Sequence, residues 1–96
     1  MTLRVLALAQ QELDDAVEWY NGQATGLGQE FLDDVDRAIR RTVSFPMSAP
    51  EIDSGVHRCL LTRFPYGLIY GIDRNTIVLL AVAHLHRHPR YWMDRR

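Results

Sequence analysis

The sequence predicts an α+β fold in which an N-terminal α-helical hairpin packs on one face of a small, twisted antiparallel β-sheet. Apolar residues recur with helical spacing in the first half of the chain, and strand patterns follow in the second half. A length of 96 residues and a hydrophobic content of 47% suit one modest core. We therefore expect residues 1–96 to form a single domain.

The first half of the chain contains a short strand pattern followed by two helix patterns. Leu3 and Val5 indicate the strand. Three glycines between positions 22 and 28 mark a turn between the helices, and Pro46 disfavours helix at Phe45, so the second helix should end near Ser44. Apolar residues at intervals of three and four predict the buried helix faces: Leu13, Ala16, Val17 and Tyr20, then Phe31, Val35, Ala38, Ile39 and Thr42.

Three strand patterns follow a predicted loop over residues 46–55. Residues 56–62 alternate in part, residues 66–72 alternate throughout, and residues 76–85 are continuously apolar or β-branched, as in a strand buried on both faces. Residues 73–75 form a short hairpin connection. The helices should cover one face of this sheet and leave the other, near the chain end, for a ligand. Three aromatic side chains are expected between sheet and helices: Trp19, Tyr66 and Tyr70.

Charge is unevenly distributed along the chain, although its net value is −1. Eight acids and no base lie between Gln10 and Asp36, whereas ten arginines and four acids follow from Arg37, a formal charge of +6 (10 − 4). All eleven arginine and lysine positions are arginines, whose planar, always charged guanidinium group suits phosphate or carboxylate. We interpret the acidic residues as solvent-exposed faces of the helices. The arginine-rich segment from Arg37 onward predicts an anionic partner.

The single cysteine, Cys59, cannot form an internal disulfide, which fits a reducing compartment. The sequence shows no secretory signal pattern, and its longest apolar stretch, residues 77–83, is far shorter than a membrane span. We expect a cytoplasmic protein with no membrane partner and no cofactor.

Candidate site residues are concentrated in the last third of the chain. Arg58, Arg63 and Arg87 are placed around neighbouring strands. Several guanidinium groups on one sheet face would hold phosphates and stabilise the charge of a phosphoryl-transfer transition state. The alternative is that these arginines are scattered over the surface.

Histidines and aromatic residues follow the last strand pattern. His84, His86 and His88 alternate, so an extended chain would point them to one side, where they could bind a metal, act as acid or base, or remain solvent-facing. Tyr91 and Trp92 lie beside arginines and could stack on unpaired bases or cover the core under a C-terminal tail. We select His84 and Tyr91 as candidate catalytic groups.

The order and spacing of these segments resemble the RelE/ParE superfamily of type II toxin–antitoxin toxins over almost the entire chain. The resemblance implies a small twisted antiparallel sheet with a helical hairpin on one side, and an antitoxin whose extended or helical segment wraps the toxin and blocks it. Some relatives cut messenger RNA on the ribosome, whereas the ParE-like ones poison DNA gyrase. The matching segments are ELDDAVEWY, GLGQEFLDDVDRAI, RCLLTRFPYGLIYGI and VLLAVAHLHRHPRYW.

The ribonuclease branch of this superfamily is matched only in part. Arg58 stands at one of its basic positions, and Arg87 or His86 stands at a later one. Tyr91 matches its terminal tyrosine, or a shift of one residue in register places Trp92 there. Leu60 replaces a second basic residue on the strand of Arg58, and Gly67 stands where an arginine commonly completes the phosphate clamp. The resemblance therefore favours the ParE-like side.

Four functions follow as hypotheses. The first is a toxin, neutralised by a cognate antitoxin, that inhibits growth through a protein target such as DNA gyrase. The second is a metal-independent endoribonuclease acting on mRNA at the ribosome, in which the arginines hold the phosphate, Arg63 substitutes in the clamp, and His84 or Tyr91 takes the 2′-hydroxyl proton. A metal-binding enzyme built on the histidines and an inactive relative retained for interaction are the remaining two.

Overall fold

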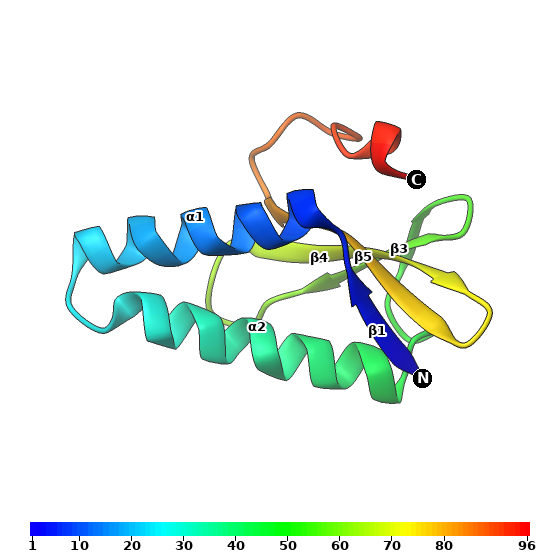
Figure 1. Cartoon of the computed structure of the whole chain (residues 1–96), viewed down its shortest axis with the longest axis horizontal. Coiled ribbons are helices and arrows are strands. Elements are labelled where there is room, and N and C mark those ends of the chain that lie inside the picture. Colours follow the sequence, from blue (N-terminus) through cyan, green and yellow to red (C-terminus); the bar gives the residue numbers. More distant parts are fainter.

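A computed structural model, which describes residues 1–96, places two antiparallel helices against one side of a five-stranded sheet (Figure 1). The observed helices match the predicted hairpin, and α1 begins earlier than its apolar pattern. In chain order the elements are β1 (Thr2–Val5), α1 (Ala7–Gln23), α2 (Leu27–Ser44), β2 (Glu51–Asp53), β3 (Val56–Leu60), β4 (Tyr66–Asp73), β5 (Thr76–His84) and the short helix η1 (Met93–Arg95).

The strands lie in the order β1-β5-β4-β3-β2, and the predicted α+β fold is confirmed. The last four strands form an antiparallel meander, whereas β1 pairs in parallel with β5. This parallel pair departs from the predicted antiparallel sheet. It can form because the connection between β1 and β5 is long, since it includes both helices and the strands β2, β3 and β4. Residues 51–53, predicted as loop, form the short edge strand β2.

The larger core cluster lies between the helices and the sheet. Its centre is formed by the predicted helix residues Phe31, Val35 and Ala38 against Leu68 and Tyr70 of β4. Tyr66 also packs there, as expected. The expectation for Trp19 was wrong, because its side chain is 59% exposed. Trp19 directly precedes the inward-facing Tyr20, so it lies about 100° around the helix from the core face.

The second core cluster lies on the opposite face of the sheet. Trp92 is buried there against Val56, Ile69, Leu80 and Ala83. Residues 85–96, which we call the C-terminal tail, therefore cover part of the face that the sequence analysis left open for a ligand. Of the two roles considered for Trp92, the structure confirms the core-covering one.

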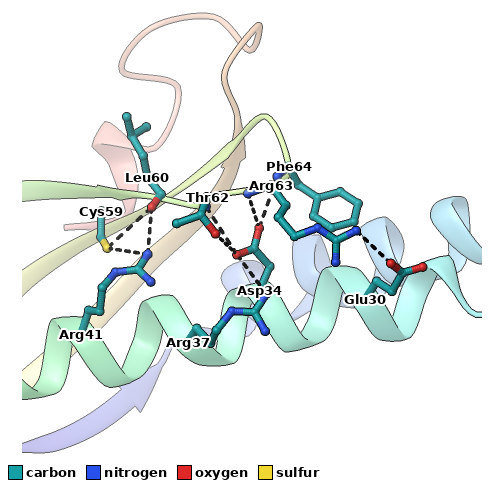
Figure 2. Close-up of polar contacts among 9 residues, drawn as sticks. All are labelled: Glu30, Asp34, Arg37, Arg41, Cys59, Leu60, Thr62, Arg63 and Phe64. Carbon is teal, nitrogen blue, oxygen red and sulfur yellow. Dashed lines mark hydrogen bonds and ion pairs between the residues drawn. The ribbon is translucent and has the colours of Figure 1, made fainter.

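A buried carboxylate of α2 holds the β3–β4 loop in place (Figure 2). Asp34 is fully buried and accepts hydrogen bonds from the backbone N–H groups of Arg63 at 2.9 Å and Phe64 at 3.2 Å. It also accepts from the hydroxyl of Thr62 at 2.9 Å and from its N–H at 3.4 Å. Arg37 lies 3.5 Å away on the next helical turn. Reading all the helix acids as solvated was therefore wrong for Asp34.

The hydrogen bonds to the Asp34 carboxylate make the stability of the fold depend on pH. Burial alone would raise the pKa of the Asp34 carboxyl, but the hydrogen bonds from Arg63, Thr62 and Phe64 outweigh burial and lower the pKa below its ordinary value of 3.8. A carboxylate with a lowered folded-state pKa stabilises the fold above its ordinary pKa, and this contribution is lost as the pH falls through the lowered value.

We therefore expect the free energy of unfolding to fall as the pH drops below 3.8, with Asp34 contributing to the slope. Urea unfolding across this range, on the natural chain and on Asp34→Asn, measures that contribution. Asp33→Asn is the matched control, since Asp33 is exposed and bonded only to Gln29. Equal slopes for the natural chain and Asp34→Asn would contradict the assignment.

No helix of the chain is both long enough and apolar enough to cross a membrane.

Candidate functional site

A groove of about 200 Å³ lies where β5 ends and the C-terminal tail begins. Four of the five predicted site residues line it: Arg58, His84, Arg87 and Tyr91. Neither Arg58 nor Arg87 lies within 4.0 Å of a carboxylate oxygen. Both guanidinium groups are therefore free to bind a carboxylate or phosphate.

Arg63 does not join this groove. Its guanidinium lies 2.8 Å from Glu30 of α2 and 5.6 Å from the ring of Phe64, on the helix side of the sheet (Figure 2). The physical reason is the Asp34 anchor, which draws the loop and its side chains toward α2. The expected arginine cluster on one sheet face is thus reduced to Arg58 and Arg87.

The absence of a side chain at Gly67 leaves space for the aliphatic part of the Arg58 side chain. A Cβ atom at Gly67 would lie 2.9 Å from Cγ and 3.1 Å from Cδ of Arg58, which is too close without a shift of that side chain. Gly67 is the position at which the resemblance to ribonucleases implies an arginine. In this chain the space above β4 holds the aliphatic part of Arg58 instead.

The three alternating histidines do not lie along one strand face. β5 ends at His84, and His88 follows in the tail. The N–H of His86 donates to Nδ1 of His84 at 3.0 Å, so the neutral His84 ring carries its proton on Nε2. His84 is thereby arranged to donate a hydrogen bond to a ligand rather than to accept its proton. No group of three metal-ligating side chains occurs in the chain.

Tyr91 joins a partly buried network that connects the tail to α1. Its hydroxyl donates to Glu12 at 2.6 Å, and Arg95 donates to both oxygens of Glu12, at 2.8 and 3.2 Å. Burial, with the hydrogen bond and charge of Glu12, raises the pKa of Tyr91 well above its ordinary value. The guanidinium of Arg87 stacks 4.0 Å from the Tyr91 ring centre. The Tyr91 hydroxyl is thus held protonated, which argues against a role as general base.

The same network provides hydrogen-bond partners for backbone groups at the edge of β5. β1 pairs with β5 only as far as Leu79, so the next backbone groups of β5 lack a strand partner. Glu12 accepts from the N–H of Val82 at 3.0 Å, and Arg95 donates to the carbonyl of Leu80 at 3.1 Å. The Glu12–Arg95 ion pair therefore takes the place of a neighbouring strand.

Comparison with known proteins identifies the family. The model of the ParE toxin of the type II toxin–antitoxin system parDE matches residues 3–89. The chain belongs to the ParE toxin family. A solved structure described as a chromosomal ParDE toxin–antitoxin system from P. aeruginosa has a similar fold, with a TM-score of 0.77 and 17% identity over 88% of this chain and 95% of that one. No curated protein matches the chain.

Membership of the ParE toxin family implies a cognate antitoxin as partner. The family match agrees with the resemblance inferred from the segments of the hairpin and the last three strands. It also agrees with the favoured ParE-like side of that resemblance.

Sequence reasoning about this ParE toxin missed two structural carboxylates, Glu12 and Asp34. Both stand at helical positions that point toward the sheet. Asp34 lies three residues after the buried Phe31, and Glu12 lies three residues after the buried Ala9. An acid placed in register with apolar core positions is the signal that could have found them.

Proposed function

We propose that this ParE toxin inhibits growth by binding a protein target, with DNA gyrase as the candidate, and not by cutting RNA. The observation that supports the proposal is that His84 and Tyr91, the two groups expected to transfer protons, form hydrogen bonds within the protein instead. The Tyr91 hydroxyl is bonded to Glu12, and Nδ1 of His84 accepts from the His86 backbone. Neither is arranged to take a proton from a ribose hydroxyl.

In this proposal the groove around Arg58 and Arg87 contacts acidic groups of the target. Its lining includes no acidic residue, and both guanidinium groups lack ion-pair partners. His84, with its donor at Nε2, adds a neutral hydrogen bond. Charge-assisted hydrogen bonds from arginine to carboxylate fix orientation as well as adding binding energy.

A supercoiling assay with purified DNA gyrase tests this proposal. The natural chain is expected to inhibit supercoiling at micromolar concentration, and the Arg58→Ala/Arg87→Ala variant should need roughly tenfold more protein. Arg74→Ala is the matched control, because Arg74 also lacks an ion pair but lies in the β4–β5 turn, at the opposite end of these strands. Absence of inhibition by the natural chain would contradict the proposal.

Ribonuclease activity is the alternative, and one observation favours it: Arg58, His84 and Arg87 share one groove. Incubating the protein with mRNA, with and without ribosomes, separates the two functions. Cleavage that is lost in both His84→Ala and Arg87→Ala, together with undisturbed supercoiling, would support the ribonuclease.

A further inference from the structure

A second groove, of about 230 Å³, lies between the C-terminal end of α2 and β3, and we call it the β3 groove. The single cysteine of the chain, Cys59, is half-buried and is among the residues that line this groove. Figure 2 shows the Cys59 sulfur beside the guanidinium of Arg41, with 3.9 Å between Sγ and Nη2. The thiol therefore borders a recess that small solutes can enter.

A buried hydroxyl without a partner lines the same groove. Thr42 is only 5% exposed, and its Oγ1 atom has no hydrogen-bond partner. Native proteins seldom leave such a group unpaired, because it loses its bond to water and gains nothing in return. Thr42 therefore offers a hydrogen bond to a polar ligand, and this observation is independent of the cysteine.

The charge around the β3 groove selects the kind of ligand. Arg41 and Arg58 line it, and neither guanidinium lies within 4.0 Å of a carboxylate oxygen. Arg41 contacts Cys59 and the carbonyl of Leu60 through Nη2 alone, which leaves its other N–H groups for a ligand. No acidic residue is among the lining side chains. Guanidinium groups in this state bind carboxylates, so the complementary ligand is a small carboxylate that also reacts with sulfur.

We propose that Cys59 is a thiol–disulfide exchange site that selects small disulfides carrying carboxylates. The Cys59 thiolate attacks one sulfur of the bound disulfide. A bond forms between Sγ and that sulfur, the ligand's own disulfide bond breaks, and the other half leaves as a thiolate that takes up the proton lost by Cys59. Cys59 is thereby oxidised and the leaving half is reduced. The carboxylates of the mixed disulfide pair with Arg41 and Arg58.

The adduct at Cys59 is reversible only through an external thiol. The chain has no second cysteine that could attack the mixed disulfide and displace the ligand. The modified fraction therefore follows the ratio of disulfide to thiol around the protein, as in the transient, redox-sensing disulfides of reducing compartments. This inference is independent of the target proposed for the toxin.

Two disulfides of different charge test the selectivity of the site. The full-length toxin is treated with glutathione disulfide, which carries carboxylates, or with bis(2-hydroxyethyl) disulfide, which is neutral, and mass spectrometry follows the adduct at Cys59. The ratio of the anionic to the neutral rate constant is expected to be about tenfold higher for the folded chain than in concentrated urea, where the groove is lost. Equal ratios in the two states, or no adduct on the folded chain, would overturn the proposal.

A pair of variants with equal loss of charge separates the groove from the overall field of the protein. Arg41→Gln/Arg58→Gln should lower the folded-state ratio by about fivefold or more, because the carboxylates lose both partners. Arg40→Gln/Arg74→Gln is the matched control, since neither arginine lines the groove and Arg40 is paired with Asp36. The control should change the ratio by less than about twofold.

Two features keep this comparison clear of folding and of thiol reactivity. Each ratio is measured on one protein, so a change in the reactivity of Cys59 affects both disulfides and cancels. Glutamine at position 41 retains an N–H donor for the Leu60 carbonyl, and thermal midpoints close to that of the natural chain verify that both variants are folded. Equal loss of selectivity in the two variants would overturn the assignment of Arg41 and Arg58 as the carboxylate-binding groups, and with it the proposal.

Discussion

Replacing Asp34 with alanine is expected to destabilise the fold by about 4 kcal/mol, because four hydrogen-bond donors at the β3–β4 loop would lose their acceptor inside the protein. A domain of this size has a total stability of about 5–15 kcal/mol, so the thermal midpoint should fall by roughly 20 °C. Differential scanning calorimetry and urea unfolding measure both quantities.

The control for this variant lies next to it on the same helix. Asp33 is exposed and accepts one hydrogen bond from Gln29, four residues earlier. Asp33→Ala should change the free energy of unfolding by less than about 0.5 kcal/mol, as at most surface positions. Similar effects of the two substitutions would mean that helix propensity, and not the loop anchor, determines the loss.

Replacing Glu12 with alanine is expected to cost about 3 kcal/mol and to release the C-terminal tail. Glu12 and Arg95 are only 16% and 13% exposed, so the substitution leaves a nearly buried guanidinium without its partner. It also leaves the Tyr91 hydroxyl and the N–H of Val82 without an acceptor. Urea unfolding gives the stability, and hydrogen exchange over residues 85–96 reports the tail.

A double-mutant cycle separates the ion pair from the rest of this network. Because an unpaired buried charge accounts for much of each single loss, Glu12→Ala/Arg95→Ala should be more stable than the sum of the single effects by about 1.5–3 kcal/mol. Glu18→Ala, on the exposed face of the same helix, should be nearly neutral. Strictly additive single effects would show that the pair contributes no coupling.

The helices and the three long strands could be predicted because their signals are local. The i, i+3, i+4 spacing around Ala16 and around Val35 sets the buried faces of α1 and α2. The alternation in β4 and the continuous apolar run of β5 likewise follow from neighbouring residues. β2 was missed because its three residues pair through a single irregular register, which no local pattern encodes.

The candidate site was predictable in composition but not in arrangement. Arg58, His84, Arg87 and Tyr91 line one groove, as their places near strand ends indicated. The separation of Arg63 from them depends on Asp34, which is far away in the sequence. Likewise, the binding of Tyr91 to Glu12 joins residues from opposite ends of the chain.

The sequence by itself determined the fold class, the ParE family and the division into an acidic helical part and an arginine-rich sheet part. These properties depend on periodicity and order, which the chain carries locally. Only the tertiary structure decided which charged groups are free. Five of the eleven arginines lie in ion pairs with carboxylates, while Arg58 and Arg87 remain without an ion pair at the groove beside the C-terminal tail. Ion pairing is set by distances between side chains that are remote in sequence, and folding alone fixes those distances.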